Sequence, residues 1–155
     1  MKKTVALFLF PDIEVLDFAG PFEVFAVTDE LRGYDTFNVI TVAEPAAPIR
    51  ARNGLRVLPD HTFTTCPSPH ILIVPGGFGT RALLKNAPVL AWLRNQAASA
   101  ELVVSVCTGA FLLAHLGLLD GLRATTHHEC LDDLRASRPP RASILPPGFT
   151  TTAKS

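Results

Sequence analysis

The sequence has no excess of charge of either sign, because 14 Lys and Arg residues balance 14 Asp and Glu residues among 155. Proteins that bind nucleic acids need basic residues to neutralise phosphates, so this balance argues against a nucleic-acid partner. Cysteine is scarce and odd in number, with three widely separated residues. That usage argues against a disulfide scaffold and predicts a reducing, cytoplasmic compartment.

Long hydrophobic runs are also lacking, since proline and acidic residues interrupt the most apolar stretch at positions 11–17. No run reaches the length of a membrane span, so we expect no membrane partner. The apolar run at positions 4–10 is not followed by a small-residue cleavage site. It is therefore interpreted as a strand rather than a signal peptide.

Hydrophobic residues nevertheless make up 48% of the chain and charged residues 18%, which excludes overall disorder. Apolar runs that suit doubly buried strands alternate with segments of helical spacing, so the sequence predicts an open, mostly parallel α/β sheet. Strands are predicted at residues 4–10, 37–42, 71–74, 102–106 and 123–126. Helices are predicted at residues 16–31, 86–98, 110–119 and 129–137.

Proline-rich segments divide the chain further. Five prolines between positions 44 and 69 predict an excursion from the sheet, with a short hairpin around Asn53-Gly54. Prolines return near the C-terminus, where no periodicity persists. We therefore predict a single domain over residues 1–145 and an irregular tail over residues 146–155.

The strongest functional signal is SVCTG at residues 105–109, where a predicted buried strand leads directly into an apolar helix. This is the pattern of a nucleophile elbow, whose sharp turn requires small residues at Ser105 and Gly109. The turn would raise the Cys107 sulfur above the carboxyl edge of the sheet, where such folds bind ligands. It would also place the sulfur at a helix N-terminus, which favours the thiolate. The alternative, a buried structural cysteine, is preferred for the other two cysteines.

Two further segments follow predicted strands at the same edge. In PGGFG at residues 75–79, the backbone N–H of Gly77 could form an oxyanion hole with that of Thr108, or the segment could be a simple turn. Asp17 stands among apolar neighbours, which favour its acid form, so it could transfer protons or merely cap a helix. The HHEC segment at residues 127–130 has no distant partners with ligand spacing, so no metal site is predicted.

Together, VLDFAGPFEVF, ILIVPGGFG and VVSVCTGAFLLAHLGLLDGLRATTHH resemble the ThiJ/PfpI superfamily over about residues 3–130. Within it, they are most similar to the branch of isonitrile hydratases and of amidotransferase-like sensor domains of AraC-type regulators. The resemblance implies a flavodoxin-like, three-layer α/β sandwich with a mostly parallel sheet. It also implies a role for each matched position: Cys107 as nucleophile, Asp17 as the facing carboxylate, Thr108 as a donor after the nucleophile, Gly77 as a backbone donor and His127 near the pocket.

One departure concerns the C-terminus, since members of this branch continue after the T-T-H segment with strands and a final long helix. The chain is thus expected to lack the family's C-terminal strand and helix. An uncovered sheet face demands a partner, so we expect a homodimer.

The resulting functional hypothesis is hydration of an isonitrile to an N-substituted formamide, with Cys107, Asp17 and Thr108 as catalytic residues. The partner is a small-molecule substrate or ligand, and no cofactor or metal is required. Two alternatives remain open. One is a ligand-sensing domain that binds in the same crevice without turnover, and the other is a redox-responsive protein in which Cys107 is oxidised.

Overall fold

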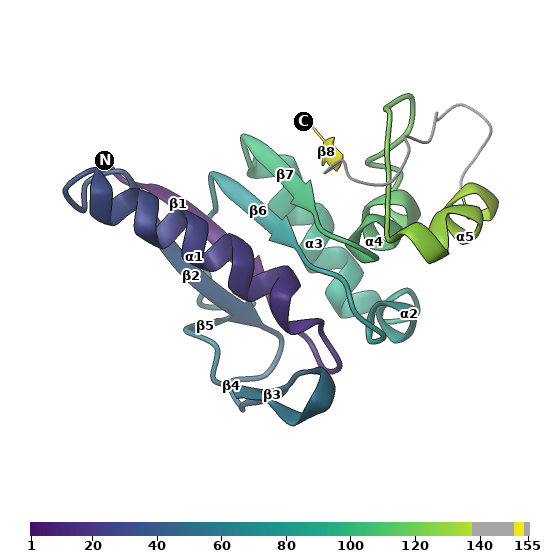
Figure 1. Ribbon diagram of the computed structural model, residues 1–155, viewed down its shortest axis with the longest axis horizontal. Helices are drawn as coiled ribbons and strands as arrows, with labels where there is room; N and C mark the ends of the chain where they lie inside the picture. The colour runs from purple at the N-terminus through teal and green to yellow at the C-terminus, as the bar shows by residue number, and fades with distance from the viewer. Residues whose placement is uncertain (138–150, 154–155) are drawn as a thin grey trace.

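The structure is a computed structural model that describes residues 1–137 and 151–153 (Figure 1). Its sheet has six strands in the order β5-β2-β1-β6-β7-β8. The first five strands in this order are parallel to their neighbours, and β8 is antiparallel to β7. The bounds are β1 (Lys3–Phe8), β2 (Phe37–Ala43), β5 (His61–Thr62), β6 (Ile71–Val74), β7 (Leu102–Ser105) and β8 (Thr151–Ala153).

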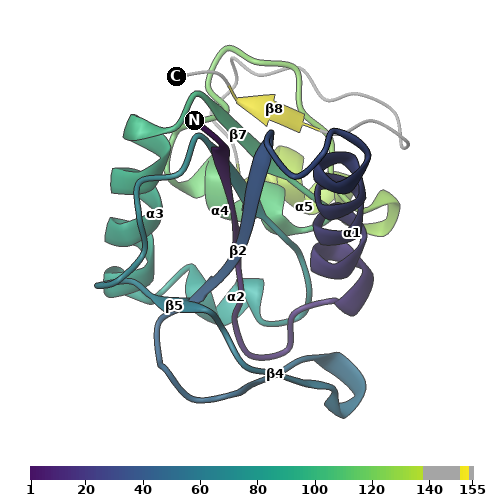
Figure 2. The ribbon, with the colours of Figure 1, turned by 90° about the vertical axis from the view of Figure 1, so that its left-hand side faces the viewer.

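Helices enclose the sheet on both sides, and Figure 2 shows α1 and α3 on opposite sides of it. The bounds are α1 (Val15–Leu31), α2 (Thr80–Leu83), α3 (Ala87–Ser99), α4 (Gly109–His115) and α5 (Leu131–Ala136). The predicted flavodoxin-like α/β sandwich with a mostly parallel sheet is therefore confirmed. In the described part of the chain, no helix is long and apolar enough to cross a membrane.

The core is centred on β1, because this strand has a parallel neighbour on each side. Val5 pairs with Val39 of β2 and with Ile71 of β6. Val5, Ala6 and Leu7 are fully buried, as expected for a strand covered on both faces. Since β1, β6 and β7 are parallel neighbours, the loops that follow them meet at one edge of the sheet. Asp17, Gly77 and Cys107 all come from these loops or from the helix starts just after them.

The predicted hairpin is present as β3 (Ile49–Arg50) and β4 (Arg56–Val57), joined by a turn, η1 (Arg52–Gly54). Asn53 has φ 63° and Gly54 has φ 96°, the left-handed conformations that Asn and Gly adopt most readily.

Several shorter predictions were wrong. Helix α4 ends at His115 instead of residue 119. Gly117, two residues later, has φ 76°, a left-handed conformation that glycine adopts easily and that is typical of helix ends. No strand forms at residues 123–126. The segment predicted as an irregular tail contains β8, where Thr152 pairs with Val104. The remainder of that tail, residues 146–150 and 154–155, lies outside the described residues.

Candidate functional site

The turn between β7 and α4 has the geometry of a nucleophile elbow. Cys107 has φ 53°, a left-handed conformation that is costly for a residue with a side chain. Gly109 packs against the end of β6 so closely that a Cβ atom would lie 2.0 Å from the carbonyl oxygen of Val74. Ser105, on the other side of the turn, is buried. Small residues are therefore required on both sides of the cysteine, as the motif predicts.

Buried hydroxyl groups hold this turn in place. Thr126 Oγ1 donates to the carbonyl oxygen of Cys107 at 2.9 Å. Thr108 Oγ1 donates to the carbonyl oxygen of Gly77 at 3.2 Å and accepts from the Gly77 N–H at 2.9 Å. The predicted oxyanion pair of Gly77 and Thr108 N–H groups is thus not available in this structure, because the Gly77 donor is already engaged by the Thr108 side chain.

Asp17 faces the elbow from the first turn of α1. Its side chain is buried, and Oδ2 accepts from the N–H of Gly76 at 3.0 Å. The Asp17 carboxylate also lies close enough to the Cys107 side chain for each group to shift the pKa of the other. At Gly76, a Cβ atom would lie 2.5 Å from the backbone nitrogen of Thr108 and 2.9 Å from Asp17 Oδ2. Only glycine at position 76 therefore lets the backbone come this close to Thr108 and Asp17, and no sequence motif predicted this requirement.

Burial shapes the acidity of both reactive groups. It raises the pKa of Asp17, which is the direction that the apolar setting predicts, although the N–H of Gly76 acts in the opposite direction. Burial and the adjacent Asp17 charge raise the pKa of Cys107 to about 11. The prediction of a favoured thiolate is wrong in this structure. The Thr108 N–H at the start of α4 stabilises the thiolate, but burial and the carboxylate outweigh it.

A cavity of about 500 Å³ opens above the elbow and brings all five predicted site residues together. Its lining residues are Glu14, Leu16, Asp17, Arg52, Gly77, Phe78, Arg81, Cys107, Thr108, His127, Glu129 and Cys130. His127 lies at the partly exposed rim, where its Nε2 is 3.5 Å from Glu129 Oε2. Arg52 and Arg81 were missed, because no local motif marks them and the hairpin and α2 bring them to the cavity. Phe78 was missed as a lining residue although it lies within the PGGFG segment.

Within the described residues, the only side chains that gather closely enough to share a metal ion are His127, His128 and Glu129. Their ligand atoms lie within 4.8 Å of one another. The three are consecutive in sequence and partly or fully exposed, and both histidines already lie within ion-pair distance of Glu129. The absence of a metal requirement remains a prediction.

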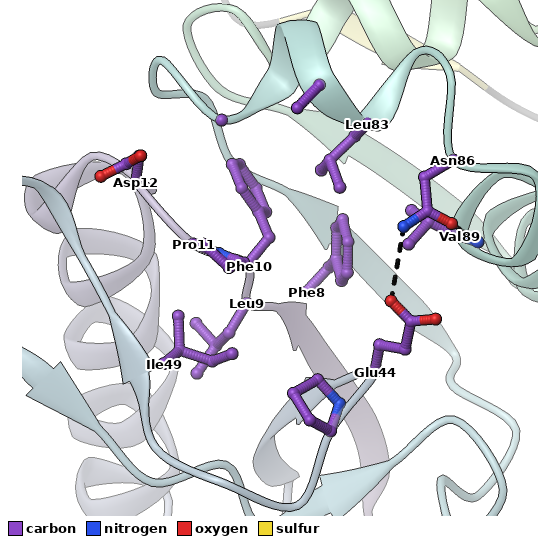
Figure 3. A pocket seen from close by; sticks show the side chains of 13 residues that line it. Phe8, Leu9, Phe10, Pro11, Asp12, Glu44, Ile49, Leu83, Asn86 and Val89 are labelled. Atoms are coloured by element: carbon purple, nitrogen blue, oxygen red, sulfur yellow. Dashed lines mark hydrogen bonds between the residues drawn. The ribbon is translucent and has the colours of Figure 1, made fainter.

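A second cavity of about 330 Å³ lies nearby, at the carboxyl ends of β1 and β2 (Figure 3). Its floor is apolar, with Phe8, Leu9 and Phe10, and a hydrogen bond of 3.4 Å joins Asn86 Nδ2 to Glu44 Oε2 at its side. It contains none of the predicted site residues. The predicted site residues therefore all lie in the cavity at Cys107.

The sequence of this chain is similar to a known protein family. Residues 3–142 match the DJ-1/PfpI family. The chain is 37% identical over 139 residues to the isonitrile hydratase of Pseudomonas putida, covering 88% of this chain and 58% of that protein. It is 27% identical over 137 residues to the HTH-type transcriptional regulator GbdR of Pseudomonas aeruginosa, covering 88% of this chain and 37% of the regulator. The chain thus spans less than two thirds of the length of these two relatives.

Solved structures of related proteins have a similar fold. A crystal structure of a ThiJ/PfpI family protein from Pseudomonas syringae superposes with a TM-score of 0.75 at 29% identity, covering 93% of this chain and 62% of that one. An AraC family transcriptional regulator from Pseudomonas putida has a TM-score of 0.79 at 22% identity, covering 97% and 80%, which shows a shared fold alone. With the family match spanning most of the sequence, this chain belongs to the DJ-1/PfpI family.

Proposed function

We propose that this protein hydrates an isonitrile to an N-substituted formamide, R–NC + H₂O → R–NH–CHO, with Cys107 as nucleophile. The observation that carries the proposal is that Cys107 and the buried Asp17 carboxylate line the same cavity, close enough for the Asp17 charge to raise the pKa of Cys107. The 37% identity to an isonitrile hydratase supports the choice of substrate class.

The first step moves the thiol proton of Cys107 to Asp17. The raised pKa of Cys107 keeps the resting sulfur as a thiol at neutral pH, and Asp17 accepts its proton as the sulfur attacks the terminal carbon of the isonitrile. Asp17 then delivers this proton to the same carbon. The product is the thioimidate R–N=CH–S–Cys107, and Asp17 is again a carboxylate.

The second step resolves the thioimidate with water. Asp17 accepts a proton from the water as its oxygen adds to the thioimidate carbon, and Asp17 passes this proton to the nitrogen. As the C–S bond breaks, Asp17 takes the hydroxyl proton of the adduct and returns it to the sulfur, so the formamide leaves and Asp17 is again a carboxylate. The N–H of Thr108 acts to lower the pKa of Cys107, so it stabilises the thiolate as it departs. None of these steps requires a cofactor.

The test is incubation of purified protein with cyclohexyl isocyanide and detection of N-cyclohexylformamide by mass spectrometry. The Cys107→Ala variant should form none above background. Cys66→Ala is a matched control, because Cys66 lies outside the cavity and should not matter. The proposal fails if the wild-type protein produces no more formamide than Cys107→Ala.

A ligand-sensing domain is the second candidate, favoured by the similarity to the regulator GbdR over 88% of this chain. In that case a metabolite panel should raise the melting temperature with no product formed. The redox-responsive alternative has less support, because the raised pKa of Cys107 disfavours the thiolate that attacks peroxide. Oxidation of Cys107 in preference to Cys66 under mild peroxide would restore it.

A further inference from the structure

Arg81 stands out among the charged residues that line the Cys107 cavity. Glu14 pairs with Arg52 at 3.0 Å, and Glu129 lies 3.5 Å from His127. The Asp17 carboxylate accepts a hydrogen bond from the Gly76 N–H. Within residues 1–137 and 151–153, Arg81 has no carboxylate partner, so it is the one cation of the cavity wall that remains uncompensated.

The guanidinium of Arg81 is nevertheless held in place. Its Cζ lies 5.9 Å from the ring centre of Phe78 and 6.0 Å from that of Phe111. Its one hydrogen bond to a side chain among the described residues is from Nη2 to the Cys130 sulfur at 3.8 Å, and sulfur is a weak acceptor. Aromatic contacts orient the group while leaving most of its N–H donors free.

Phe78 gives the same wall an apolar surface. Its ring is largely exposed, at 59%, although phenylalanine is usually buried. The Cζ of Arg52 lies 4.5 Å from its centre, so the ring contacts both arginines. An apolar surface beside a free guanidinium suits a ligand that has a short hydrocarbon part ending in an anionic group.

We propose that Arg81 forms an anion-binding subsite of this cavity, which takes the carboxylate of a small ligand. Guanidinium N–H groups form a planar fork that matches a carboxylate. A phosphate dianion is a poorer match, because the second arginine of the wall, Arg52, is already neutralised by Glu14. A ligand bound at Arg81 could also be the substrate, and that part of the proposal rests on the proposed function. The substrate would be an isonitrile whose R group ends in a carboxylate.

The test separates binding from turnover. Binding of 3-isocyanopropanoate and of its methyl ester to the Cys107→Ala protein is measured by calorimetry at low salt. The acid should bind about tenfold more tightly than the ester, the size of effect that one charge-assisted hydrogen-bonded pair provides. Adding Arg81→Gln should abolish that preference, Arg81→Lys should restore part of it, and added salt should weaken it.

Arg94→Gln on α3 is the matched control, because Arg94 is exposed and lies outside the cavity. It should leave the preference unchanged. The subsite is refuted if acid and ester bind equally, or if Arg81→Gln weakens both by the same factor. If the acid is preferred through Arg81 but neither compound yields a formamide in the wild-type protein, the subsite stands and the hydratase proposal fails.

Discussion

The burial of the Asp17 carboxylate and the catalytic role proposed for it make opposite demands. Because burial raises its pKa, ionising Asp17 costs the folded state free energy. A group with a raised pKa favours the folded state at low pH, and this contribution is lost as the pH rises through the folded pKa. The wild-type protein should therefore lose stability relative to Asp17→Asn as the pH rises from the ordinary value of 3.8 to neutrality.

Urea denaturation of both proteins at several pH values measures this difference. In the same variant, formamide production should fall about 100-fold or more, since the amide cannot accept the thiol proton. Asp120→Asn, at an exposed position outside the cavity, should change neither property. An Asp17→Asn protein that is active, or whose stability relative to wild type does not rise with pH over this range, would contradict the proposed role of Asp17.

The sequence predicted that Cys107 and Asp17 lie in one site, because the SVCTG motif identifies Cys107 and the apolar neighbours of Asp17 identify that carboxylate. It could not predict the contact of Asp17 with Gly76, which lies 59 residues away along the chain. The acidity of the cysteine was mispredicted for a related reason. A helix start is visible in a sequence, whereas the burial that raises the pKa arises from the packing of distant segments.

The junction of β7 and α4 depends on a close contact at Gly109. Gly109→Ala should lower the free energy of unfolding by about 2 kcal/mol or more, because its Cβ would collide with the Val74 carbonyl oxygen. Gly20→Ala in α1 is the matched control. The nearest neighbour of its Cβ is Leu16 Cδ1 at 3.8 Å, and its φ is not positive. This control should be neutral or stabilising by up to about 1 kcal/mol, measured by chemical denaturation. Equal stability of the two variants would show that the elbow is not tightly packed.

Asp29 connects the end of α1 to the start of β2. Its carboxylate accepts from the N–H groups of Thr36 and Phe37, each at 2.8 Å, and pairs with Lys2 at 2.8 Å. The Lys2 ammonium and the two N–H groups lower its pKa, so its ionised form stabilises the folded state above the ordinary value of 3.8. Asp29→Asn should unfold at a lower temperature near neutral pH, and the difference should shrink as the pH falls below 3.8. A constant difference across that range would show that charge is not involved.

At the scale of elements, length decided what could be predicted. The strand at β6 and the helix at α1 were recognisable because each has an apolar pattern of its own. Strand β5 and helix α2 have two and four residues and therefore no periodicity. Strand β5 exists because His61 pairs with Val42 of β2, a contact that only the folded chain supplies.

Exposed apolar side chains on α1 bear on the assembly of the whole molecule. Leu16, Val24 and Leu31 are 75%, 64% and 81% exposed, and Val27 is 38% exposed. Their spacing of eight, three and four residues places them on one side of the helix. A stripe of this kind is typical of a protein interface. We therefore expect the predicted homodimer to form through α1.

The dimer would also affect the candidate site, because Leu16 lines the Cys107 cavity as well as the exposed stripe. Val24→Glu should shift the protein from dimer to monomer in size-exclusion chromatography with light scattering. Since Val24 does not line the cavity, any accompanying rise in KM would indicate that the partner subunit helps to close it. Leu58→Glu is the matched control, because Leu58 is 65% exposed but lies outside α1. A wild-type protein that is monomeric at the concentrations used for activity would exclude this interface, and the cavity would then have to function with its mouth open to solvent.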